Sequence, residues 1–217
     1  MTDAIHPLVA EAVPNSVEIQ AGTGMLVTGS NMSGKTTLLR TLGLTTVMAQ
    51  SLHTCFASAY ASPMLVVRSC IGRADDILAG KSYYLVEVEA LLGLVRDSTD
   101  VMPHLFLLDE MFRGTNAVER IAAGQSVLVE LIDGDKPHVV VAATHDNELV
   151  DLLSGSYAPF HFGDALTDDT LTFDYHLRVG RATSRNAIAV LRLNGAPPAL
   201  VERALASAAE LDRQRAR

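Results

Sequence analysis

GSNMSGKTT, residues 29–37, lies between the apolar run MLVT (residues 25–28) and a helical pattern that begins at Lys35. Its spacing is GxxxxGK[ST], in which two glycines are separated by four residues and followed by lysine and threonine. Glycines let the backbone wrap until its N–H groups point inward, and the following helix start adds positive potential. The stretch therefore predicts a phosphate-binding loop between a strand and a helix.

The loop supplies most of the candidate nucleotide-binding residues. Lys35 provides a point charge for the β and γ phosphates, and the Thr36 hydroxyl is a candidate ligand of Mg²⁺. The simpler alternative is a glycine turn that carries a surface lysine. The complete candidate set in the loop is Gly29, Ser30, Asn31, Met32, Ser33, Gly34, Lys35, Thr36 and Thr37.

Apolar runs alternate with helical patterns along the first two thirds of the chain. Expected strands are residues 25–29, 64–68, 104–110 and 138–145, and expected helices are residues 35–52, 82–95 and 116–132. The runs lack polar alternation, which indicates strands buried on both faces. In the second helix the spacing predicts an apolar stripe of Leu85, Val88, Leu92 and Val95. The alternation predicts an α/β fold with a mostly parallel central sheet flanked by helices.

Two expected strands end in residues suited to catalysis. Asp109 and Glu110 follow the run HLFLL, and a strand carries them to the sheet edge where α/β folds bind ligands. There Asp109 can hold a magnesium shell, and Glu110 can orient or deprotonate water. His145 ends the run VVVAAT, where it can hydrogen-bond a γ-phosphate or serve as a neutral core histidine.

The C-terminal third has a different pattern. SYAPFHFG and LTFDYHLRVG are strand-like and joined by the polar turn TDD, and NGAPP (residues 194–198) separates two expected helices. The 217 residues suit one domain, 1–217, and no repeat or linker is evident.

Composition excludes several classes of protein. Apolar residues make up 48% and the net charge is −8, which argues against a disordered chain and against a broad DNA-binding face. The chain has no uninterrupted apolar run of about 18 residues and no secretory start, so no membrane span and a cytoplasmic location are expected. Cys55 and Cys70 have no metal-ligand spacing, and both are expected to be reduced and buried.

Four segments together resemble the ATPase domain of the MutS family, the DNA mismatch repair proteins and their paralogues. They are TGSNMSGKTTLLRT, GRADDILAGKSYYLVEVE, LLDEMFRGTN and AATHD, and the resemblance covers nearly the whole chain. It implies a P-loop NTPase fold of the ABC-like type with added C-terminal helices. It also implies ATP and Mg²⁺ as cofactors, Lys35, Glu110 and His145 as catalytic residues, and Thr36 and Asp109 as metal ligands.

The resemblance implies further roles that spacing does not give. In the family two ATPase domains face each other, so a homodimer or a MutS-like partner is expected, with Ser82 contacting the other subunit's nucleotide. Asn31 matches a residue that places the γ-phosphate or water, and Val13 matches a position that packs on adenine. Arg113 to Asn116 match a loop at the dimer face, and Asp75 and Asp76 match an acidic pair in the segment before Ser82.

Other functions remain open at this stage. The segments that read mismatches or clamp DNA are not in this sequence, so DNA contacts are expected from regions outside it, and the chain is expected to be part of a longer protein. The alternatives are a nucleotide-gated interaction module without mismatch repair, another ABC-type ATPase and a small-molecule kinase. The segment AGKSYYLVEVE argues against the ABC-type alternative, because it stands where such proteins carry an LSGGQ-like signature.

Overall fold

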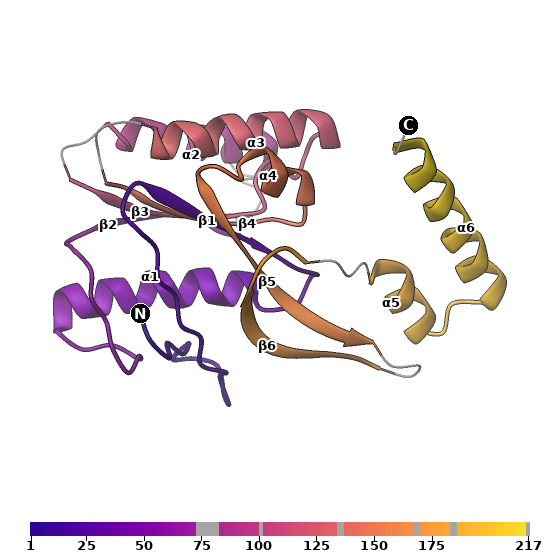
Figure 1. Cartoon of the computed structure of the whole chain (residues 1–217), viewed down its shortest axis with the longest axis horizontal. Coiled ribbons are helices and arrows are strands. Elements are labelled where there is room, and N and C mark those ends of the chain that lie inside the picture. Colours follow the sequence, from indigo (N-terminus) through magenta and orange to yellow (C-terminus); the bar gives the residue numbers. More distant parts are fainter. Residues whose placement is uncertain (73–82, 100–101, 134–136, 167–169, 183–185, 216–217) are drawn as a thin grey trace.

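A single mixed sheet forms the centre of the protein. The computed structural model describes all residues except 73–82, 100–101, 134–136, 167–169, 183–185 and 216–217. Within this part the strands form a six-stranded sheet in the order β2-β3-β4-β1-β5-β6 (Figure 1). Their bounds are β1 Thr23–Thr28, β2 Val66–Cys70, β3 His104–Asp109, β4 Val139–Ala143, β5 Tyr157–Leu166 and β6 Leu171–Val179. The pairs are parallel except for β5 and β6, which are antiparallel.

Helices cover both faces of the sheet (Figure 1). Helix α1 (Lys35–Leu52) lies on one face, where Leu38, Leu39 and Leu42 join a core cluster with the inner side chains of β1 and β3. The opposite face is covered by α2 (Tyr83–Asp97), α3 (Ala117–Ile132) and α4 (Asn147–Leu152), which form a second core cluster. This is the three-layer solution expected for a mostly parallel sheet.

The C-terminal helices stand apart from these layers. Helix α5 (Ala187–Leu193) and helix α6 (Pro198–Arg215) pack mainly against each other beyond the β5–β6 ribbon (Figure 1). Several of their apolar side chains are exposed, among them Val190, Leu191 and Leu205.

The N-terminal segment is held against β6 by one side chain. The Asn15 amide nitrogen donates to the Tyr175 carbonyl at 2.9 Å, and the Asn15 amide oxygen accepts from the Leu177 backbone N–H at 2.7 Å. Asn15 therefore replaces a missing strand neighbour along part of β6 and brings Val13 and Tyr175 to the same region.

The structure confirms the α/β class, the mostly parallel sheet and the long expected elements, with strand ends shifted by up to three residues. Three expectations were wrong. Strand β2 is an edge strand, with Arg68 and Ser69 exposed, so it is not buried on both faces. The stripe predicted for α2 is wrong for Leu85 (45% exposed) and Leu92 (51% exposed), although Val88 and Val95 do pack against the core; Leu91 and Leu94 are the buried leucines, because α2 is rotated relative to that stripe. Cys55 is only partly buried, whereas Cys70 is buried as expected.

One short helix differs from the sequence prediction. Helix α4 was not expected, because its six residues are too few to show a helical period. Among the described residues, no helix is both long and apolar enough to cross a membrane.

A glycine in β1 makes room for a tyrosine that joins two layers. Gly24 pairs with Tyr157 of β5, and a Cβ at Gly24 would lie 2.0 Å from the Tyr157 ring. The ring is 3% exposed, and its hydroxyl donates to the Leu128 carbonyl of α3 at 2.7 Å. The missing side chain therefore lets the ring cross the sheet surface and reach α3.

Gly24→Ala is expected to destabilise the protein by about 3 kcal/mol, near the top of the usual range for overpacking, because the buried ring cannot move aside. Gly93→Ala in α2 is the control, since nothing lies within 4 Å of a Cβ there. This control should be neutral or stabilising by up to about 1 kcal/mol through helix propensity. Urea unfolding measures both variants, and equal stabilities would contradict the packing.

Burial raises the pKa of Tyr157 above its ordinary value of 10.0. The unfolded chain then loses this proton first, so the stability from Tyr157 is complete below about pH 10 and declines at higher pH. Tyr157→Phe should cost about 1 kcal/mol at pH 8 by removing the hydrogen bond to Leu128. In urea titrations the wild-type protein should lose more stability than Tyr157→Phe between pH 9 and pH 11. Equal losses would show that the pKa of Tyr157 is not raised by burial.

Candidate functional site

A pocket of about 510 Å³ lies beside the carboxyl ends of the central strands. Strand register sets Val27 of β1 and Asp109 of β3 level with Ala143 of β4, so the loops that follow leave the sheet at one edge. This is the edge where α/β sheets bind ligands, and the volume suits a small molecule. A second cavity of about 480 Å³, between α1 and the N-terminal segment, contains none of the predicted site residues.

The loop of residues 29–34 needs glycine at its start. Gly29 has φ = 143°, and a Cβ there would lie 2.8 Å from Ser33 Oγ and 3.2 Å from the Phe162 carbonyl oxygen. A side chain would therefore push this loop away from β5. The tight loop leads directly into α1, whose first residue is Lys35.

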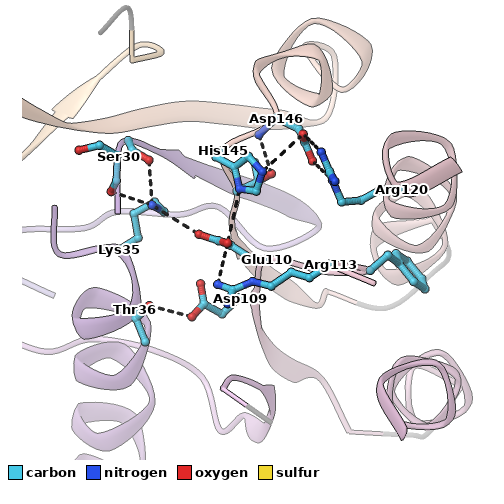
Figure 2. Close-up of polar contacts among 12 residues, drawn as sticks. Ser30, Lys35, Thr36, Asp109, Glu110, Arg113, Arg120, His145 and Asp146 are labelled. Carbon is cyan, nitrogen blue, oxygen red and sulfur yellow. Dashed lines mark hydrogen bonds and ion pairs between the residues drawn. The ribbon is translucent and has the colours of Figure 1, made fainter. Parts of the chain in front are cut away.

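Lys35 is enclosed by the loop and points toward the acidic end of β3 (Figure 2). Its Nζ donates to the carbonyls of Gly29 at 2.8 Å and Ser30 at 2.9 Å, and lies 3.6 Å from Glu110 Oε1. The side chain is 4% exposed. Burial lowers the pKa of Lys35, and the charges of Glu110 and Asp109 oppose that shift. The alternative of a surface lysine is wrong.

Thr36 and Asp109 form an oxygen pair at the foot of the pocket. Thr36 Oγ1 donates to Asp109 Oδ2 at 2.7 Å (Figure 2). Asp109 Oδ1 is buried and makes no hydrogen bond within the described part of the chain. A hydroxyl and a carboxylate are hard oxygen donors, and Mg²⁺ uses one or two such ligands together with phosphate oxygens and water. The pair therefore fits this ion, although no group of three or more His, Cys, Asp or Glu suited to a metal occurs among the described residues.

Glu110 is the buried centre of a charge cluster. Its side chain is 8% exposed, and its backbone has φ = 47°, a left-handed conformation that is uncommon outside glycine. Its carboxylate lies 2.6 Å from Arg113 Nη2 and 3.4 Å from His145 Nδ1, with Lys35 on a third side. The hydrogen bond from His145, with Arg113 and Lys35, lowers the pKa of Glu110 to about 2 against the opposing effect of burial.

His145 lies beside Glu110 and half-exposed rather than in the core. Its side chain is 49% exposed, so the alternative of a core histidine is wrong. The hydrogen bond with Glu110 raises the pKa of His145. Its other ring nitrogen, Nε2, lies 4.0 Å from Asp146 Oδ1, and Asp146 binds Arg120 of α3 (Figure 2).

The pocket has an apolar side. Val13, Phe162 and Tyr175 line it together with Asn31 and Met32 of the loop, and Met32 is 83% exposed. The N-terminal segment thus supplies part of the lining, and Val13 belongs to it. Ser82, Asp75 and Asp76 lie outside the described residues, and Thr37 is an exposed residue of the lining.

Several residues at the site were missed by reasoning from the sequence. Tyr175 lines the pocket on β6, where its carbonyl accepts from Asn15, and Arg120 pairs with Asp146 beside His145. Asp146 could have been singled out from the sequence, because an acidic residue next to a candidate catalytic histidine can form an ion pair with the imidazole. Nothing local marked Arg120.

A polar bridge connects the loop with α5. Ser30 Oγ donates to Asp164 Oδ2 of β5 at 2.7 Å, and the amide nitrogen of Asn186, the residue before α5, donates to the same oxygen. Close by, Thr28 Oγ1 accepts from the Ala182 backbone N–H at 2.9 Å. The start of the loop and the segment before α5 are therefore held together.

Comparison with known proteins gives one consistent result. The model of the family described as MutS domain V matches residues 25–212. The chain is 33% identical over 210 residues to DNA mismatch repair protein MutS 2 of Halobacterium salinarum, covering 92% of this chain and 24% of that protein. It is also 33% identical over 200 residues to DNA mismatch repair protein MutS of Streptococcus pyogenes serotype M1, covering 90% of this chain and 23% of that protein. The chain thus spans about a quarter of the length of these relatives.

Asp164→Ala should lower the free energy of unfolding by about 1–2 kcal/mol, because Ser30 and Asn186 both lose a charged acceptor. Amide hydrogen exchange in α5 and α6 should become faster. Asp174→Ala is the control, since Asp174 lies on the neighbouring strand in an exposed pair with Arg178 and should change stability by less than about 0.5 kcal/mol. Equal effects of the two substitutions would show that the bridge does not hold the helices.

Proposed function

Because the chain belongs to the MutS family, through the region called domain V, we propose that it binds and hydrolyses ATP and acts as a nucleotide-driven dimer switch of a MutS-like DNA mismatch repair protein. The DNA contacts of that protein would come from regions outside this sequence. The observation that carries the proposal is the convergence of Lys35, the Thr36–Asp109 pair, Glu110 and His145 at one sheet edge (Figure 2).

The loop and α1 suit a nucleotide triphosphate. Backbone N–H groups and the helix start would receive the phosphates, and Lys35, now bonded to two loop carbonyls, would exchange these contacts for phosphate oxygens. Val13 and Tyr175 offer an apolar and an aromatic wall for a base. Thr36 and Asp109 would hold Mg²⁺, which would neutralise phosphate charge when bound.

Glu110 and His145 suit the hydrolytic step. With its pKa near 2, Glu110 stays ionised at neutral pH and can accept a hydrogen bond from an attacking water. His145 is half-exposed and borders Glu110, so its imidazole can donate to a terminal phosphate without leaving the site. Arg113, also half-exposed and in the pocket lining, is a further cation at the same place.

The dimer part of the proposal rests on the family and on two segments. Ser82 is our candidate for a residue that reaches the nucleotide of the other subunit, and the loop of Arg113 to Asn116 is our candidate for the opposing surface. A site shared between two copies would make hydrolysis depend on association, which links nucleotide turnover to the dimer.

The test is ATP hydrolysis by the purified chain over a range of protein concentrations. Specific activity should rise with concentration and fall in Lys35→Ala and Ser82→Ala. Glu110→Gln should lower kcat by about 100-fold or more, with ATP affinity changed by less than about threefold, because the carboxylate acts on water rather than on binding. Glu130→Gln, an exposed site at the end of α3, is the matched control and should have wild-type activity.

Each result bears on one part of the proposal. Wild-type activity in Glu110→Gln would overturn the role of Glu110. Specific activity that depends neither on protein concentration nor on Ser82 would support an ATPase but contradict a site shared between two copies. If light scattering gives the same molar mass with ATP as with ADP, the association does not depend on the nucleotide, and the proposed switch is contradicted.

A further inference from the structure

Arg120 and Asp146 form an enclosed ion pair directly behind His145 (Figure 2). Arg120 Nε donates to Asp146 Oδ2 at 2.8 Å, and Arg120 Nη2 donates to Asp146 Oδ1 at 2.7 Å. The two side chains are only 17% and 9% exposed. A two-point contact of this kind fixes the carboxylate in orientation as well as position.

His145 lies between two carboxylates. Its Nδ1 is 3.4 Å from Glu110 Oε2, and its Nε2 is 4.0 Å from Asp146 Oδ1. The second distance is too long for a hydrogen bond, and Asp146 Oδ1 already accepts from Arg120. By occupying both oxygens of Asp146, Arg120 leaves Glu110 as the nearer and stronger partner of the imidazole.

The ion pair also closes a ring of contacts around the site. Arg120 is in the first turn of α3, which begins shortly after Glu110, and Asp146 directly follows His145. The Asp146 backbone N–H donates to Thr144 Oγ1 at 3.0 Å, and the Glu110 backbone N–H donates to the Ala143 carbonyl at 2.9 Å. The segments after β3 and β4 are therefore joined at the sheet by the Glu110–Ala143 backbone bond and further out by Arg120 and Asp146, while Thr144 orders the β4 loop from within.

We propose that Arg120 and Asp146 are positioning residues that keep His145 directed toward Glu110 and toward the place of the terminal phosphate. This inference deepens the proposed ATPase function and rests on it. Arg120 is not one of the residues that line the pocket, and it bonds to Asp146 through two nitrogens, so it acts through Asp146 and His145.

Hydrolysis kinetics test the proposal first. Arg120→Ala frees a carboxylate beside His145, and kcat should fall by about tenfold while KM changes by less than twofold. Arg120→Lys restores one charged contact and should recover part of the loss. Arg181→Ala is the matched control, because Arg181 forms a similar pair with Asp151 at an exposed place (52% and 71%) and should leave kcat unchanged.

A double-mutant cycle separates positioning from general stability. In a His145→Ala background, Arg120→Ala should lower kcat by less than twofold, since the residue through which it acts is gone. His145 is half-exposed, so its removal should not unfold the chain. The same tenfold loss in both backgrounds would overturn the proposal.

An experiment without nucleotide tests the contact itself. Imidazole ¹⁵N resonances of the folded chain identify His145 by the signal missing in His145→Ala. Its Nδ1 signal should shift in Arg120→Ala and not in Arg181→Ala, and an unchanged signal would overturn the proposal. If Arg120→Ala shifts the signal but the wild-type chain does not hydrolyse ATP, the positioning role stands and the proposed function is refuted.

Discussion

The parallel pairing of β1, β4 and β3 is the constraint on which the site depends. Backbone hydrogen bonds set Val27 and Asp109 level with Ala143, so three loops leave the sheet at the same height. The loop of residues 29–34, the turn at Glu110 and the segment of His145 are far apart in the sequence, and this pairing brings them to one edge of the sheet. A shift of one residue in either pairing would turn alternate side chains to the opposite face and separate Lys35 from Glu110.

Burial of Glu110 is the second physical condition. An ionised carboxylate that is 8% exposed is tolerated only with charged partners, and Lys35, Arg113 and His145 surround it. Its left-handed backbone adds local strain, which proteins retain mainly where surrounding contacts fix the conformation. The cluster therefore holds the carboxylate in one place and ionised, the state in which it can orient water.

Local sequence patterns sufficed for much of this arrangement. The loop of residues 29–37, the strand before Asp109 and the helix after Asn116 carry their signals within a few residues, and the structure places them as expected. The stripe predicted for α2 was right for Val88 and Val95 and wrong for Leu85 and Leu92, because more than one apolar stripe fits the helical period and the neighbouring helix decides between them. The contacts of Arg120 with Asp146 and of Asn15 with β6 join residues 26 and about 160 positions apart, and no local pattern encodes them.

The two carboxylates that the sequence did not reveal have a common arrangement. Asp146 accepts from Arg120 of α3 and lies beside His145, and Asp164 accepts from Ser30 of the loop and from the residue before α5. In each case one carboxylate joins a loop of the site to a helix outside it. Because a partly buried carboxylate is costly to leave without its donors, the loop cannot move far unless the helix moves as well. Each carboxylate therefore ties the motion of one loop of the site to that of a helix, α3 behind His145 and α5 behind residues 29–34.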